Sequence, residues 1–223
     1  MKIAIIGATG GTGKHTVERA LQLGHEVVAV ARRPEQISPQ KRLIIRKGDV
    51  LNGSSLAEAI AGVDVVISCI GPSGGSTSKG IMNTLTSNFS PGTVMSEGIP
   101  NIVEACRRVG VKRFVMQSGI GLSDGKELSV GSRLMLGINR RVFSKAITDK
   151  RAAEQSVQRS NLDWVIVRPA GLSHAEATLS YTAGPAARIA PFQPLSFADC
   201  ADSLVRAATT EPGWIGKIVN VGK

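Results

Sequence analysis

The residues with the clearest chemical meaning stand near the start of the chain, where positions 7–13 read Gly-Ala-Thr-Gly-Gly-Thr-Gly. Gly7 allows a tight turn, Gly10 lets the backbone approach a pyrophosphate, and Gly13 lets a helix pack close to a strand. The first turn of that helix offers unpaired N–H groups and a positive dipole end to phosphate oxygens. The loop therefore predicts a dinucleotide site, with ligands from Gly7, Thr9, Gly10, Gly11, Thr12 and Gly13.

The end of the second apolar run indicates which dinucleotide binds. A carboxylate there would hold the ribose 2′-hydroxyl of NAD, but the run ends in Arg32 and Arg33. Two guanidinium groups suit a 2′-phosphate and favour NADP(H), and a pair of surface arginines is the alternative. Asp49 either accepts a hydrogen bond from the adenine amino group or caps a turn. Because adenosine passes over this edge of the sheet, we also assign Val50, Ile70 and Gly71 to the cofactor site.

The rest of the chain predicts the scaffold that positions these residues. We expect strands at 2–6, 26–31, 43–46, 64–70, 112–117, 163–167 and 217–221, and helices at 13–23, 54–61, 97–109, 144–159 and 199–209. Ser54 with Ser55 is expected to cap the second helix, and Asp199 the last one. The alternation predicts an α/β fold, a Rossmann-type doubly wound parallel sheet.

One domain, 1–223, accounts for the whole chain, with 171–197 as a small C-terminal substrate lobe beyond the sixth strand. Two loop-rich stretches, 71–92 and 119–139, follow the fourth and fifth strands. Loops after parallel strands lie at the carboxyl edge of the sheet, where ligands bind.

Composition and charge exclude several classes of protein. No apolar run approaches the roughly 20 residues of a membrane helix, and the start is too short for a signal peptide, so we expect a cytoplasmic protein. The three cysteines are far apart in apolar surroundings, which predicts buried thiols and no metal site. The net charge of +10 favours phosphate-bearing ligands. The basic clusters lack interleaved aromatic residues, which argues against nucleic acid.

Several motifs place the chain in a known superfamily. The phosphate loop, Gly48-Asp49-Val50, and the stretches 149–155 and 162–169 resemble the NAD(P)H-binding, NmrA-like branch of the atypical short-chain dehydrogenase/reductases. Within that branch, 90–98 and 101–103 resemble the biliverdin-IXβ reductase/flavin reductase family. The resemblance implies an NADPH-dependent reductase of flavins and linear tetrapyrroles. It also implies cofactor contacts for Met95, Ser118, Lys150 and Pro169.

The chain departs from this superfamily at the positions that carry acid and base chemistry. Lys150 matches the lysine of the Tyr-x-x-x-Lys pattern, but Ala146 stands in place of the tyrosine. The flavin and biliverdin reductases carry a second hydroxyl at Gly119 and a histidine near Gly171, and His174 is three residues from the latter. The catalytic candidates are Ser118, Lys150 and His174. Their alternative roles are a strand-end serine, a solvated helix lysine and a loop histidine.

These features predict an NADPH-dependent reductase that transfers hydride to a flavin such as FMN, a linear tetrapyrrole or a quinone-like acceptor. Such acceptors need alignment and electrostatics more than a strong side-chain acid. The alternative is a non-catalytic NADP(H)-binding redox sensor of NmrA type. Ala146 counts against a ketone or sugar-nucleotide dehydrogenase, and only the charge supports nucleic-acid binding. We expect a small-molecule acceptor as partner, no membrane, and a monomer or weak homo-oligomer.

Overall fold

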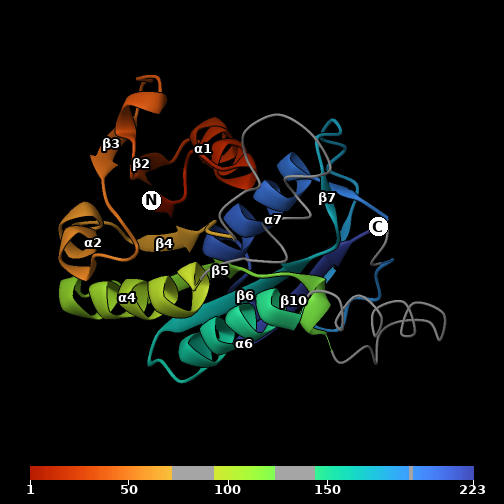
Figure 1. Cartoon of the computed structure of the whole chain (residues 1–223). Coiled ribbons are helices and arrows are strands. Elements are labelled where there is room, and N and C mark those ends of the chain that lie inside the picture. The colour runs from red at the N-terminus through yellow and green to blue at the C-terminus, as the bar shows by residue number, and fades with distance from the viewer. Residues whose placement is uncertain (72–92, 124–143, 191–192) are drawn as a thin grey trace.

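The computed structural model describes residues 1–71, 93–123, 144–190 and 193–223 (Figure 1). The strands within these residues are β1 (Lys2–Ile6), β2 (Glu26–Ala31), β3 (Leu43–Lys47), β4 (Val65–Ser68), β5 (Arg113–Gln117), β6 (Asp163–Pro169), β7 (Leu172–Ser173), β8 (Thr182–Gly184), β9 (Leu195–Ser196) and β10 (Lys217–Gly222). The helices are α1 (Gly11–Gln22), α2 (Gly53–Ala59), α4 (Val94–Val109), α6 (Ser144–Gln158) and α7 (Phe197–Thr209), with 3-10 turns η1 (Pro34–Gln36), η2 (Ile120–Leu122) and η3 (Pro212–Trp214).

The described strands form one eight-stranded sheet in the order β3-β2-β1-β4-β5-β6-β10-β8, and a separate pair, β7-β9. All neighbours from β3 to β10 are parallel, and β8 runs antiparallel to β10. The predicted doubly wound sheet is confirmed. Strand order reverses between β1 and β4, and ligands of such sheets bind beyond the carboxyl ends at that point. The loop 7–13 leaves β1 at this position.

Helices cover both faces of the sheet (Figure 1). Helices α1 and α7 pack together on one face, and α2, α4 and α6 lie on the other. Alternate residues of each central strand point into one of the two layers, as in β1, where Ile3 and Ile5 face α1 and α7 while Ala4 and Ile6 face α2 and α4. Strands buried on both faces explain the continuous aliphatic runs of the sequence.

The helix starts correct two predicted caps. Asn52, and not Ser54 or Ser55, caps α2, because its side chain accepts a hydrogen bond from the Ser55 amide. Ser196 caps α7 by accepting from the Asp199 amide at 2.9 Å. The prediction that Asp199 is the cap was wrong, since this carboxylate lies inside the helix and is fully buried.

The described part of residues 171–197 contributes strands to two different sheets. Strand β8 extends the main sheet at its edge, and β7 pairs in parallel with β9. The parallel pair lies beyond the end of β6, at the same edge as the loop 7–13. Its role as part of a substrate lobe stays a prediction.

Candidate functional site

The loop after β1 has the geometry of a phosphate cradle. Gly7 adopts a positive φ of 84°, and its amide donates to Val30 O at 3.2 Å, which ties the loop to β2. The Gly10 amide donates to Gly7 O at 2.9 Å. A Cβ atom on Gly13 would lie 2.0 Å from Gly7 O, so only glycine fits there.

The first turn of α1 is prepared for an anion. It contains no acidic residue, and its N-cap residue Gly10 supplies no side-chain hydrogen bond. The amides of this turn therefore keep their capacity to bind phosphate oxygens. The predicted ligands Thr9, Gly11 and Thr12 lie on this loop and turn, half-buried for Thr9 and Gly11 and buried for Thr12.

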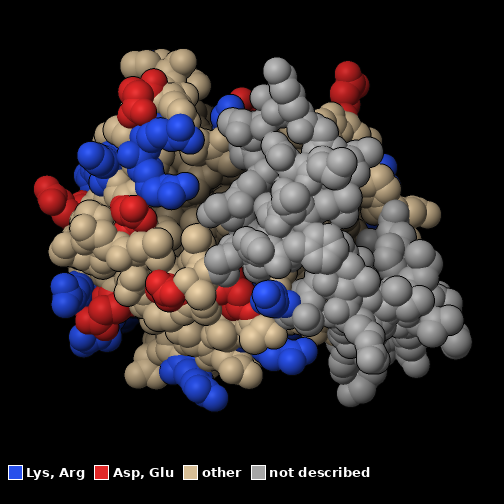
Figure 2. Space-filling view, viewed as in Figure 1, with Lys and Arg blue, Asp and Glu red and all other residues tan. Residues whose placement is uncertain are grey.

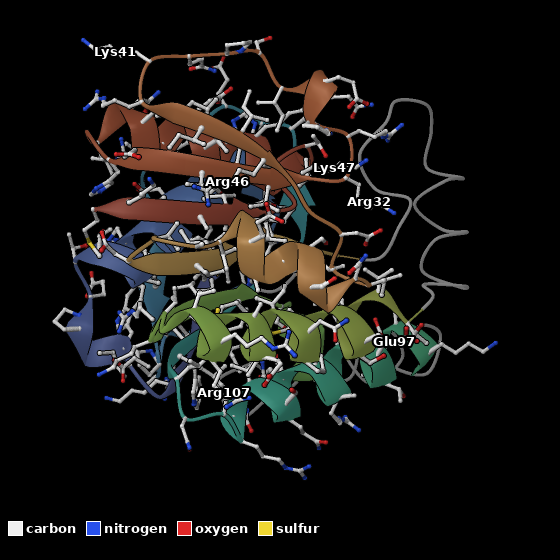
Figure 3. The ribbon with its side chains drawn as sticks, turned by 90° about the vertical axis from the view of Figure 1, so that its left-hand side faces the viewer. Arg32, Lys41, Arg46, Lys47, Glu97 and Arg107 are labelled. Carbon is white, nitrogen blue, oxygen red and sulfur yellow. The ribbon has the colours of Figure 1, made fainter. Side chains whose placement is uncertain are left out.

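A basic hollow lies beside the cradle, between the carboxyl ends of β2 and β3 and the helix α2. It has a volume of about 860 Å³ and is lined by, among others, Arg32, Arg46, Lys47, Asp49, Asn52 and Ser55. Figure 2 shows basic side chains gathered on this side of the molecule. The register pairs Ala31 with Lys47, which brings Arg32 and Lys47 to the same end of their strands (Figure 3).

The three basic residues of the hollow differ in how their charges are used. Arg46 donates through Nη1 to Ala59 O and Ala61 O, both at 3.0 Å, so it satisfies carbonyls at the end of α2. Arg32 and Lys47 are exposed. Lys47 was not singled out from the sequence, although its place at the end of β3 was the available signal. Arg33 is exposed but does not line the hollow, so its contact with a cofactor stays a prediction.

Asp49 and Val50 form a turn that α4 holds in place. Asp49 Oδ1 accepts from the Leu51 amide at 3.0 Å, which establishes its turn-capping role and leaves the adenine contact as a prediction. Val50 is buried, and its carbonyl accepts from Asn101 Nδ2 at 2.8 Å. A Cβ on Gly98 would lie 2.8 Å from Val50 Cγ2. Asn101 therefore fixes a predicted cofactor-binding turn, a role that its sequence position did not indicate.

Ser118 and Lys150 both lie at the end of β5. The Ser118 amide continues the sheet by donating to Val167 O at 2.7 Å, while its buried Oγ has no hydrogen-bond partner among the described residues. Lys150 Nζ lies 3.3 Å from the position that a Cβ on Gly119 would occupy. The buried Ser118 hydroxyl and the Lys150 amino group, which approaches the neighbouring Gly119, thus both lie at the carboxyl end of β5.

Burial lowers the pKa of Lys150, and the nearby carboxylates of Glu154 and Asp149 oppose that shift. Both carboxylates are already engaged. Asp149 accepts from the Ser96 amide at 2.8 Å and thereby caps α4 from another helix, and Glu154 binds Arg168 through two hydrogen bonds of 3.0 and 2.6 Å. Lys150 makes no ion pair within the described ranges.

The other predicted residues are spread around this edge. Met95 and Pro169 are buried, Ile70 is half-buried and Gly71 is exposed, so their cofactor contacts stay predictions. His174 is exposed and its ring contacts Phe197, with ring centroids 4.8 Å apart. No contact in the described part of the chain joins His174 to Ser118 or Lys150.

The three cysteine thiols have raised pKa values, which predicts low reactivity at neutral pH. Burial raises the pKa of Cys69 and of Cys106 to about 12, and raises that of Cys200 well above its ordinary value. Since the thiolate is the reactive form, we expect all three thiols to react slowly with an aromatic disulfide reagent at pH 7.5 until the protein is unfolded. In the unfolded protein, all three thiols should react rapidly with the reagent. Rapid reaction of one thiol in the folded protein would contradict this expectation and support thiol-based sensing.

The fold and the phosphate cradle define a nucleotide-binding protein with the scaffold of the atypical short-chain dehydrogenase/reductases. The chain belongs to the NAD(P)H-binding family, whose model matches residues 7–211. An uncharacterised chloroplastic protein of Arabidopsis thaliana is 31% identical over 182 residues, 79% of this chain and 61% of that protein. The chain thus spans less than two thirds of that relative's length.

Two solved structures show the same fold over the whole chain. ChuY from Escherichia coli O157:H7, an anaerobilin reductase, matches with a TM-score of 0.75 at 22% identity, over 100% of this chain and 97% of that chain. A short-chain dehydrogenase/reductase from Veillonella parvula in complex with NADP matches with a TM-score of 0.74 at 19% identity, over 100% of this chain and 94% of that chain.

Within the described ranges, no helix has the length and apolar character needed to cross a membrane. The same residues hold no group of three His, Cys, Asp or Glu side chains suited to a metal ion.

Proposed function

We propose that the protein is an NADPH-dependent reductase that delivers hydride to a conjugated acceptor, namely a flavin, a linear tetrapyrrole or a quinone-like ring. The observation that carries this proposal is the approach of Lys150 Nζ to Gly119, next in sequence to the buried Ser118, while Ala146 is buried where related enzymes carry a tyrosine. This arrangement can orient polar groups. It lacks the usual proton donor for a ketone.

The choice of NADPH is supported by the basic hollow. Arg32 and Lys47 are exposed cations at adjacent strand ends, and the Gly7 amide of the cradle binds the Val30 carbonyl, two residues before Arg32. A doubly negative 2′-phosphate is favoured by two such charges, whereas a neutral hydroxyl gains little from them. The solved neighbour from Veillonella parvula that binds NADP has the same fold.

The residues of the chain bind the cofactor and align it with the acceptor, and NADPH would supply the hydride when bound. The amides of the first turn of α1 hold the pyrophosphate, and the two cations hold the 2′-phosphate. Ser118 Oγ, which is buried and has no hydrogen-bond partner among the described residues, would donate to or accept from a carboxamide or an acceptor oxygen. The Lys150 ammonium stabilises negative charge that develops on the reduced acceptor. Water supplies the proton, so no side-chain acid is required.

The test is oxidation of NADPH by the purified protein with riboflavin, FMN, biliverdin and a simple quinone offered in turn. We expect saturable turnover with at least one of them. Lys150→Met should lower kcat more than it changes the affinity for NADPH, because the ammonium acts on the developing charge. Turnover that is unchanged in Lys150→Met would contradict the assigned role.

A non-catalytic NADP(H) sensor is the second candidate, and the buried Ala146 at the tyrosine position favours it. Tight binding of NADPH without turnover on any of the four acceptors would support this alternative and remove the reductase proposal. The two outcomes are separated by measuring the NADPH Kd in the same preparation.

A further inference from the structure

A short parallel pair of strands brings two rings together beside the phosphate cradle. Strands β7 and β9 pair Leu172 with Leu195 and Ser173 with Ser196. The next residues along each strand are His174 and Phe197, and their ring centroids are 4.8 Å apart with the planes tilted by 54°. This separation lies within the range of favourable aromatic contacts. The pair is therefore a product of strand register, and not of chance side-chain placement.

The Phe197 ring also packs directly on the cradle. A Cβ atom on Gly11 would lie 2.9 Å from Phe197 Cε1, so the ring rests on the first turn of α1. Phe197 is half-buried between this turn and His174, and His174 is exposed. The imidazole is thus the outer member of a tilted pair of rings whose inner ring packs on the first turn of α1.

The segment that carries His174 is held firmly against α7. The fully buried Asp199 accepts from the Leu179 amide at 2.7 Å, from the Thr178 amide at 3.0 Å and from Thr178 Oγ1 at 3.2 Å. The Tyr181 hydroxyl donates to Asp202, which also accepts from Arg19 Nε at 2.7 Å. Two carboxylates of one helix therefore fasten residues 178–181, a few positions after His174, against α7.

We propose that His174 and Phe197 form an aromatic wall of the acceptor site, on which the flat conjugated ring of the acceptor stacks. The inference rests on the proposed reductase function and gives that site its selectivity for planar acceptors. It assigns His174 a binding role in place of proton donation. An exposed imidazole that packs on a half-buried Phe197 at the ligand-binding edge presents a flat face on which a planar ligand can stack.

Four variants separate stacking from proton transfer. His174→Phe keeps a ring and removes the ring nitrogens, whereas His174→Leu and His174→Ala remove the ring. Phe197→Leu keeps apolar volume against Gly11. His25→Ala, at a turn before β2, is the matched control for loss of a histidine. The readouts are KM and kcat for riboflavin and the Kd of NADPH.

Stacking predicts that His174→Phe stays within about twofold of wild type. His174→Leu and His174→Ala should raise the riboflavin KM by roughly three- to tenfold with kcat at saturation nearly unchanged, as expected for loss of one aromatic contact. The NADPH Kd should not move in any His174 variant. An equal loss of kcat in His174→Phe and His174→Ala would overturn the proposal and make the imidazole a proton donor. An unchanged riboflavin KM in His174→Ala would overturn it as well.

A binding measurement keeps this test separate from the test of the function. Riboflavin fluorescence is titrated with each variant in the presence of NADP⁺, where no turnover occurs. Binding by wild type that weakens in His174→Ala but not in His174→Phe supports the wall even if no acceptor is reduced. If wild type turns over and riboflavin binding is the same in His174→Ala and His174→Phe, the reductase proposal stands and the aromatic wall is refuted. Failure of wild type to bind riboflavin overturns the wall as a flavin-binding surface, whereas the reductase proposal is overturned only if none of the four acceptors is reduced.

Discussion

Replacing Gly13 by alanine should abolish cofactor use. The added Cβ would lie 2.0 Å from Gly7 O and 3.0 Å from the Ala8 Cα, and both neighbours are backbone atoms that cannot rotate away. The loop must shift by an ångström or more, which moves the amides of the first turn of α1 away from the phosphates. A displacement of about 1 Å at a reacting site costs roughly 100-fold in rate. We expect at least that loss in NADPH turnover or binding, and a free energy of unfolding lowered by roughly 3 kcal/mol.

The matched control is Gly213→Ala, in η3, where a Cβ meets nothing within 4 Å and the backbone needs no positive φ. It should leave NADPH affinity unchanged. Isothermal titration with NADPH and thermal unfolding of both variants provide the measurements. Near-normal NADPH affinity in Gly13→Ala would mean that the dinucleotide does not lie on this loop.

Removing the Arg32 guanidinium should change the preference between the two cofactors. Charge-assisted hydrogen bonds to a phosphate are worth roughly a tenfold to hundredfold difference in affinity. Arg32→Ala should weaken NADPH by that factor and change NADH by less than about twofold, because NADH lacks the 2′-phosphate. Lys47→Ala should act in the same direction with a smaller effect, since an ammonium binds phosphate as a point charge. The ratio of kcat/KM for the two cofactors gives the result.

Two further substitutions serve as controls for the Arg32→Ala result. Arg33→Ala should have a smaller effect than Arg32→Ala, because only Arg32 lines the hollow. Equal effects would show that both arginines hold the phosphate, as the sequence alone predicts. Lys41→Ala removes a charge near the opposite end of β3 and should leave both cofactors unaffected (Figure 3). Equal losses for NADPH and NADH in Arg32→Ala would refute the NADPH assignment.

Features set by residues close in sequence were predictable. The loop of Gly7 to Gly13 combines a turn, a close contact and a helix start within seven residues, and the structure reproduces each of them. Buried aliphatic strands were predictable because a parallel sheet covered on both faces leaves little choice of residue. Helix caps were less certain, since Asn52 and Ser54 are both good capping residues two positions apart, and packing decided between them.

Features that depend on contacts between distant elements were not predictable from the pattern. Asp149 caps the start of α4 from α6, and Asn101 holds the Val50 carbonyl, each across about fifty residues of sequence. Lys47 enters the hollow only because β3 pairs with β2 in one register. The ring pair of His174 and Phe197 depends on two strands of two residues each, too short for any periodicity to reveal.

Two contacts in the first half of α4 set a fixed distance between distant parts of the chain. Asp149, next to Lys150, accepts a hydrogen bond from the Ser96 amide of the helix. Five residues further along the helix, Asn101 donates a hydrogen bond to the Val50 carbonyl. At 1.5 Å per residue, roughly 7.5 Å of helix separates the two attachment points. Helix α4 therefore sets the spacing between the Val50 turn, which is predicted to contact adenosine, and the Lys150 region, where we propose hydride transfer. A residue inserted between Ser96 and Asn101 would add about 1.5 Å and a rotation of roughly 100° to this spacing, and would misalign the two halves of the site even though no ligand contact is changed.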